Sequence, residues 1–406
     1  MTGLTRLRLL AVALACGMLF ALAAPVYVLF FSRHPGHDWM VYYSAARAYL
    51  DGNLRLAFDG DALTAHMNAA FAGWLSEPLT FHPWIYPPPF LMLLIPFGAL
   101  PFGAGYALFL IATFACLLLT LWHTAGQGYR RWLVVFSVLL SAPTAFTIGN
   151  GQNAFLSTAL LVGGFGLLAR YPIGAGVLLG LLTYKPQLWL MVPVALVAAQ
   201  QWRALGSAAV SATGTALASV AVFGIEPWRA WLEWVINPPS ETYLKWLIWG
   251  RSGSESVYNN LIVLGASHAI ANLGQAAACL GAAACVWWSY RQGLRNNRQL
   301  VVLLAATMLA APHAGIYDAV LLVVGATLFF VYALDESLSW GTLAVPVGAW
   351  MIQFGNPPDV FRIGLLSPIL TSLLIATAIS GIRAGPASVQ DSVQAVRGSQ
   401  VTANGG

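Results

Sequence analysis

Charged side chains are scarce in this 406-residue sequence: Asp, Glu, Lys and Arg together make up 8% of it, while 59% of the residues are hydrophobic. A soluble domain carries about 25% charged residues, and so few charges cannot cover a surface exposed to water. Most of the surface must therefore face lipid. The net charge of +5 is too small and too scattered to indicate nucleic-acid binding, so we interpret it as charge that orients the chain in the membrane.

Cysteine is scarce as well. Cys16, Cys116, Cys279 and Cys285 all lie in apolar runs, and none has the spacing of a zinc site. We interpret them as packing residues in the lipid phase.

The N-terminal apolar run resembles a signal peptide, with Arg6 and Arg8 before it and Ala21-Leu22-Ala23 as a candidate cleavage site. The run continues to Phe31, however, and is long enough to span a bilayer. An uncleaved first helix is therefore the favoured interpretation, and the rest of the topology is the same in both cases.

Apolar runs near 20 residues predict an all-α polytopic membrane protein with about 12 transmembrane helices and both termini in the cytoplasm. The predicted spans are 7–30, 103–124, 132–148, 154–169, 172–184, 187–200, 206–223, 261–290, 299–311, 319–334, 340–354 and 363–382. Arginines fall on one side of this arrangement, which the positive-inside rule assigns to the cytoplasm. The segment 86–101 is broken by prolines, and we expect it to be re-entrant or to lie in the outer leaflet.

Residues 1–383 are predicted to form a single transmembrane domain, followed by a disordered cytoplasmic tail at 384–406. Two long segments, 31–88 and 224–260, are predicted to lie outside. The first contains two interfacial helix patterns, at about 39–50 and 61–75, and the second is rich in tryptophan, which favours a position at the headgroups.

Lys185 stands between two apolar runs and is followed by Pro186. A lysine at the bilayer centre costs roughly 2.5–3.5 kcal/mol, so the topology places it at the outer end of a helix, where Pro186 forces a break. The other polar stretches predicted on the same outer face are 34–52, 82–89, 148–155, 311–320 and 355–362. Several ionisable groups at one membrane depth indicate a functional site.

Each of these polar residues also has a structural interpretation. Asp38 and Asp318 both precede a helix pattern and could cap it, and Lys185 could reach headgroup phosphates. His313 could be a turn residue, and Gln152 could satisfy carbonyls at a helix break. Gathered on one face, they are harder to explain in this way.

Glycosyl transfer from a lipid-linked donor is the chemistry that such a site favours. The donor phosphate lies at the membrane–water boundary, where Lys185 and His313 could bind it. Asp38 or Asp318 could deprotonate the acceptor hydroxyl. Preorganised hydrogen-bond donors can stabilise the leaving phosphate without a metal.

Five motifs follow one another along the chain: "DWMVYYSAARAYLDG", "YPPPFLMLLIPFGALP", "GNGQNAFL", "GLLTYKPQ" and "PHAGIYDAVLL". In this order, over about residues 8–380, the sequence resembles glycosyltransferase family 87, which has the GT-C fold and includes polyprenol-phosphate-mannose-dependent mannosyltransferases. The resemblance implies inverting transfer of a hexose, mannose above all, from a polyprenyl-phosphate-linked donor to a glycolipid or glycan acceptor. It implies no metal and no cofactor, and a periplasmic active site in the plasma membrane.

The resemblance also implies roles for individual residues. Asp38 matches the catalytic aspartate of the first outer loop, and His313 matches the late histidine. The predicted site has Asp38 and His313 as catalytic residues, Lys185, Tyr86 and Gln152 at the donor phosphate and lipid, and Tyr42, Tyr43, Asn153 and Asp318 lining the substrate pocket. The first loop lacks a paired Asp-x-Asp site, and Asp59-Gly60-Asp61 lies in a turn-like context, so no metal ligands are predicted.

Two other classes stay open at this point. A lipid-linked sugar flippase or transporter would also have broken helices and charges within the membrane, although the paired repeats typical of that class are missing. A non-catalytic component of envelope polysaccharide assembly would keep the fold and lack the Asp–Lys–His set.

Overall fold

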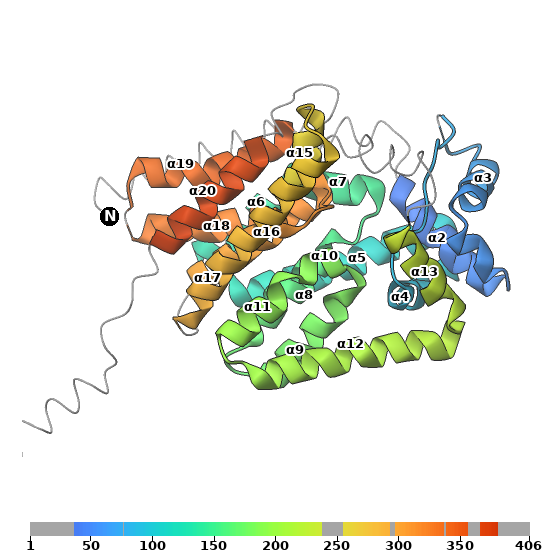
Figure 1. Cartoon of the computed structure of the whole chain (residues 1–406), viewed down its shortest axis with the longest axis horizontal. Helices are drawn as coiled ribbons and strands as arrows, with labels where there is room; N and C mark the ends of the chain where they lie inside the picture. Colours follow the sequence, from blue (N-terminus) through green and yellow to red (C-terminus); the bar gives the residue numbers. More distant parts are fainter. Residues whose placement is uncertain are drawn as a thin grey trace, which may run out of the picture.

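The computed structural model describes residues 36–75, 77–237, 255–292, 297–336, 338–355 and 366–380, and in these ranges it consists of helices without any strand (Figure 1). The elements are α2 (His37–Leu50), η1 (Leu54–Phe58), α3 (Gly60–Ala70), α4 (Pro88–Gly98), α5 (Phe102–Thr124), α6 (Tyr129–Leu139), α7 (Ala142–Asn150), α8 (Ala154–Leu167), α9 (Pro172–Leu181), η2 (Leu182–Tyr184), α10 (Pro186–Trp189), α11 (Met191–Ala198), α12 (Trp202–Phe223), α13 (Glu226–Ile236), α15 (Val257–Val263), α16 (His268–Arg291), α17 (Asn297–Ala310), η3 (Ile316–Ala319), α18 (Val320–Asp335), α19 (Trp340–Met351), η4 (Ile352–Gly355) and α20 (Ser367–Ser380). The predicted span 7–30, the tail 384–406 and most of the polar stretch 355–362 lie outside the described residues.

Among the described residues, four helices are long and apolar enough to cross a membrane: α5, α12, α16 and the continuous helix Ile316–Asp335, formed by η3 and α18. The helices α6 and α7 make a fifth candidate together, bent by 52° at their junction. Six further apolar helices have only 10–17 residues. The all-α membrane architecture is thus confirmed, while the count of 12 spans is not, because many of the predicted runs form shorter or broken helices.

The predicted elements of the outer segments are present as helices. α2 and α3 match the patterns at 39–50 and 61–75. α4 begins at Pro88, a position that suits proline because the first helical N–H needs no partner within the helix. Its 11 residues extend about 16 Å, which is half of the roughly 30 Å hydrocarbon core.

Close backbone contact joins α12 to α9, along which it runs (Figure 1). A Cβ atom at Gly176 would lie 2.2 Å from the carbonyl oxygen of Ala204, and one at Gly180 would lie 2.4 Å from that of Ala208. Small residues four apart let two membrane helices approach each other closely. This contact fixes α9, and with it the chain that continues into η2 and α10.

Two groups of helices flank the centre of the molecule (Figure 1). The C-terminal helices α16 to α20 gather on one side, and α17 and α18 are buried over most of their length. The helices α2, α3, α4 and α13 gather at the other end, and α7, α8 and α10 lie between the two groups. The ends of these central helices carry the polar residues described next.

Candidate active site

The candidate site lies where helices stop. Gly151, with φ of +74°, ends α7 and turns the chain into α8, and a Cβ there would lie 2.5 Å from Trp39 Cβ. Glycine meets both demands, because it adopts positive φ without strain and carries no side chain. Lys185 has a non-helical backbone, with φ of −120° and ψ of 75°, before Pro186, which begins α10. The predicted break at the Lys185–Pro186 pair is therefore confirmed.

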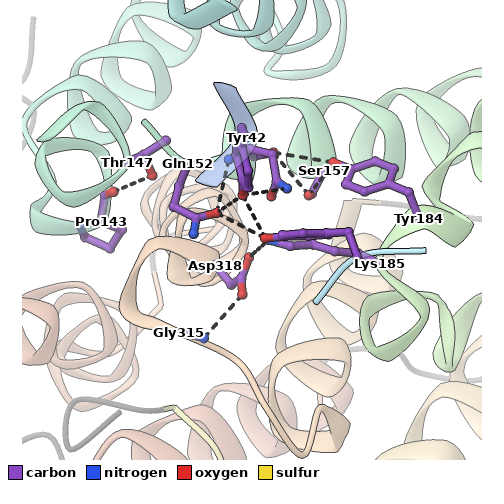
Figure 2. Close-up of polar contacts among 11 residues, drawn as sticks. Tyr42, Pro143, Thr147, Gln152, Ser157, Tyr184, Lys185, Gly315 and Asp318 are labelled. Carbon is purple, nitrogen blue, oxygen red and sulfur yellow. Dashed lines mark hydrogen bonds and ion pairs between the residues drawn. The ribbon is translucent and has the colours of Figure 1, made fainter. Parts of the chain in front are cut away.

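Lys185 and Asp318 form a buried ion pair (Figure 2). Lys185 Nζ lies 2.5 Å from Asp318 Oδ1, and each side chain is only 2% exposed. Asp318 Oδ2 accepts a hydrogen bond of 3.2 Å from the N–H of Gly315, so the capping interpretation of Asp318 also holds. The partner of this buried lysine is thus a carboxylate of the protein itself, and the ammonium is enclosed by the protein instead of extending outward to lipid headgroups.

Four predicted site residues form one buried hydrogen-bond network: Tyr42 of α2, Tyr86 of the segment before α4, and Gln152 and Asn153 at the α7–α8 junction. The Tyr42 hydroxyl donates a 2.8 Å hydrogen bond to Gln152 Oε1 (Figure 2). It also lies 2.8 Å from the Tyr86 hydroxyl and accepts a 3.1 Å hydrogen bond from Asn153 Nδ2. Burial, reinforced by neighbouring phenol and carboxylate groups, raises the pKa of Tyr42 and of Tyr86 well above the usual value. Both hydroxyls therefore stay neutral and serve as hydrogen-bonding groups.

The network and the ion pair belong to one site. Figure 2 shows the Lys185–Asp318 pair directly beside Tyr42 and Gln152. The carboxylates of Asp318 and Asp38 both act electrostatically on the Tyr86 hydroxyl. The structure thus brings together residues from five of the six polar stretches that the sequence analysis placed on one face.

Asp38 is the second residue of α2, and its carboxylate faces His82. Asp38 Oδ1 lies 3.2 Å from His82 Nε2, and the Asp38 side chain is 23% exposed. The N-cap of α2 is Gly36, so the capping interpretation of Asp38 is wrong. Burial disfavours the charge, but the hydrogen bond and the charge interaction with His82, with smaller contributions from Gln152 and His37, outweigh it and hold the pKa of Asp38 below its usual value. The carboxylate is therefore ionised at neutral pH, as a general base requires.

Tyr43 and His313 make different contacts. The Tyr43 hydroxyl donates a 3.2 Å hydrogen bond to the carbonyl of Leu100, and its ring lies edge-on to Phe102, so Tyr43 joins α2 to the start of α5. His313 lies in the turn between α17 and η3, with its ring edge-on to that of Tyr258, 6.3 Å between centroids.

Sequence reasoning missed His82, although the stretch 82–89 was placed on the correct face. A membrane-edge carboxylate needs a partner, and a histidine in the neighbouring polar stretch was the signal that could have found it. The triplet Asp59-Gly60-Asp61, predicted to be turn-like, lies at a helix start: Gly60 and Asp61 begin α3, and the Asp59 side chain caps it by accepting a 3.0 Å hydrogen bond from the N–H of Ala62. In the described part of the chain, no three His, Cys, Asp or Glu residues are grouped as a metal site.

The sequence model of glycosyltransferase family 87 matches residues 84–312, more than half of the chain. The chain belongs to glycosyltransferase family 87. It is therefore a membrane glycosyltransferase, and the family implies a lipid-linked sugar donor and an acceptor. No curated protein and no solved structure matches the chain, so the GT-C fold class is not confirmed.

The family-87 match covers only part of the site. Tyr86, Gln152, Asn153 and Lys185 lie inside the matched range, and the carboxylates Asp38 and Asp318 lie outside it. Geometry alone joins the two sets.

Proposed function

We propose that this family-87 protein transfers a hexose, mannose in the first instance, from a polyprenyl-phosphate-linked donor to a glycolipid or glycan acceptor, on the extracytoplasmic side and with inversion. The observation that carries the proposal is the position of Asp38. A partly exposed carboxylate, hydrogen-bonded to His82, lies beside a buried polar network in a chain that is otherwise apolar.

The contacts at the two ends of α5 support an extracytoplasmic position of the candidate site. At its first residue, the carbonyl of Phe102 accepts a 3.2 Å hydrogen bond from Trp39 Nε1, next to Asp38. Near its last turn, the guanidinium of Arg131 lies 4.0 Å from the centre of the Trp122 ring. The 23 residues of α5 extend about 34 Å, enough to cross the hydrocarbon core.

The helix formed by η3 and α18 likewise has the candidate site at its first turn and an arginine at its last. Asp318 lies in its first turn, and Asp335 at its last residue pairs with Arg130 at 3.1 Å. The candidate site and the arginine pair Arg130–Arg131 thus lie at opposite ends of two candidate spans. Arginines concentrate on the cytoplasmic side, which favours an extracytoplasmic site.

In the proposed reaction, Asp38 takes the proton of the acceptor hydroxyl while that oxygen attacks the anomeric carbon. The bond from the anomeric carbon to the phosphate oxygen breaks, and the polyprenyl phosphate leaves with the electron pair. A single displacement inverts the configuration. Neutral Tyr86 and the Gln152 amide belong to the polar network near Asp38, and both suit hydroxyl groups of the bound sugar as hydrogen-bonding partners.

The leaving phosphate needs cationic or hydrogen-bonding partners, and we assign them to Lys185 and His313. An ammonium group has three N–H donors, so the ion pair with Asp318 is compatible with a phosphate oxygen as a second ligand. Asp318 then keeps the lysine neutralised in the membrane between turnovers.

Transfer of label from radiolabelled polyprenyl-phosphate-mannose to extracted membrane lipids tests the proposal with the purified full-length protein. Asp38→Asn should reduce transfer by about 10²–10⁴-fold, the usual loss for a general base. Asp61→Asn is the matched control, because this exposed carboxylate lies in the first turn of α3.

Wild-type activity in Asp38→Asn would exclude the base role. If the wild-type protein uses another polyprenyl-phosphate hexose and not mannose, only the identity of the donor sugar in the proposal would change. Label that changes leaflet without forming a product would identify a flippase.

A further inference from the structure

The Asp38–His82 pair joins two parts of the chain that meet only through folding. Asp38 lies in the first turn of α2, and His82 lies in the segment 81–87 between α3 and α4, 44 residues later. The two side chains are similarly accessible, at 23% and 22% exposed. The pair therefore lies at the boundary between the buried network and solvent.

The segment 81–87 is anchored on both sides of the imidazole. The backbone N–H of His82 donates a 2.9 Å hydrogen bond to Thr64 Oγ1 of α3. Trp231 Nε1 of α13 donates a 3.2 Å hydrogen bond to the carbonyl of Ile85, and Trp84 stacks on Phe90. These contacts hold the backbone of the segment without the His82 side chain.

The carboxylate of Asp38 is held by His82. With its proton on Nε2, the imidazole donates to Oδ1 over 3.2 Å, and the Gln152 amide at the α7–α8 junction also favours the ionised carboxylate. A carboxylate offers about four acceptor positions, so room for an acceptor hydroxyl remains. A hydrogen-bond partner on another element restricts the torsion of the Asp38 side chain, and a base works only when it is aimed at the proton it removes.

We propose that His82 is a positioning residue of the transferase: its imidazole holds the Asp38 carboxylate in the orientation that accepts the proton of the acceptor hydroxyl. This inference rests on the proposed function, because it assumes that Asp38 is the base. His82 itself touches neither sugar nor phosphate in this role.

A pH profile separates this role from a structural one. Among the described residues, the other titratable side chains that interact with Asp38 are His37 beside it in α2, Tyr42 and Tyr86 of the network, and Tyr106 of α5. The interaction with His82 favours the ionised form of Asp38. Its loss raises the pKa of Asp38, so the base becomes protonated at a higher pH and the acidic limb of the rate profile moves upward.

The experiment compares His82→Leu and His82→Gln in the full-length protein, with the polyprenyl-phosphate hexose that the wild type uses. His82→Leu should lower kcat by about 10²-fold, the usual result of misplacing a catalytic group, with the KM for the donor within about twofold. His82→Gln keeps an N–H donor and should recover part of this loss, while its acidic limb still moves upward because glutamine carries no charge. His66→Leu is the matched control, an exposed histidine of α3 that should change neither quantity.

Three outcomes decide the matter. If Asp38→Asn is inactive while both His82 variants keep the wild-type kcat and pH profile, the positioning role is refuted and the proposed function stands. If Asp38→Asn is fully active, the base role fails and the positioning role fails with it. If His82→Leu does not fold, His82→Gln decides through its acidic limb, and an unshifted limb refutes the inference.

Discussion

Replacing Lys185 with methionine removes the cation of a buried ion pair and leaves the Asp318 carboxylate buried in the protein without this partner. Both side chains are 2% exposed and their charged atoms are 2.5 Å apart. Removing one partner of such a pair costs about 3–5 kcal/mol, because the remaining charge has lost its compensation. We expect Lys185→Met to destabilise the folded protein by that amount.

The double variant Lys185→Met/Asp318→Leu carries the argument further. Replacing both partners with apolar side chains removes the uncompensated charge, and such replacements are often neutral or stabilising by about 1–4 kcal/mol relative to the pair. The double variant should therefore be more stable than Lys185→Met alone. It would still lose activity if Lys185 binds the donor phosphate.

Reversible unfolding in mixed detergent micelles, followed by circular dichroism, measures these free energies. The pair of Arg130 with Asp335 is the matched control, since its side chains are 47% and 26% exposed and exposed pairs contribute only about 0–1 kcal/mol. Asp335→Asn should accordingly change little. A Lys185→Met protein within about 1 kcal/mol of the wild type, or a double variant no more stable than the single one, would refute the reasoning from the ion pair.

Two further predictions concern the network and its support. Gly151→Ala combines a positive φ with a Cβ only 2.5 Å from Trp39 Cβ. It should therefore lower the stability of the protein more than Gly52→Ala, since Gly52 has a similar φ of +76° and open space around it. The backbone strain alone is about 1–2 kcal/mol, and thermal unfolding of the two variants measures the difference in stability. Tyr42→Phe removes the hydroxyl on which three hydrogen bonds converge, and we expect it to lower hexose transfer at least tenfold. Tyr43→Phe is the control, because the Tyr43 hydroxyl bonds a backbone carbonyl, and it should keep transfer within about threefold. Equal losses of transfer in the two variants would show that the network is not part of the site.

Local signals in the sequence explain what could be predicted. Proline after Lys185 and glycine at position 151 mark the ends of helices whatever the rest of the chain does, and both breaks occur where they were expected. Polar residues within apolar runs are also recognisable as candidate site residues, because each carries a free-energy cost in lipid unless it has a partner. The gathering of Asp38, Gln152 and Asp318 followed from these signals.

The partners of these residues could not be predicted, because pairing depends on which helix ends meet. Lys185 and Asp318 are 133 residues apart, and the sequence alone offered a lipid phosphate as an equally good anion. His82 was overlooked for the same reason. Hydropathy predicted about 12 spans, whereas four or five helices of the described residues are long and apolar enough to cross a membrane. An apolar composition is typical of a short buried helix such as α17 as well as of a full crossing.

The distance along the chain between Lys185 and Asp318 matters for biogenesis. A ribosome adding about 5–20 residues per second needs about 7–27 s to make the 133 residues that separate them. During that time the ammonium has entered the translocon without its own counter-ion, and something else must accommodate it: water in the insertion channel, an anionic lipid, or delayed release of that segment. The C-terminal helices thus complete the insertion of a segment made long before them, and a chain truncated before residue 318 should leave that segment poorly integrated.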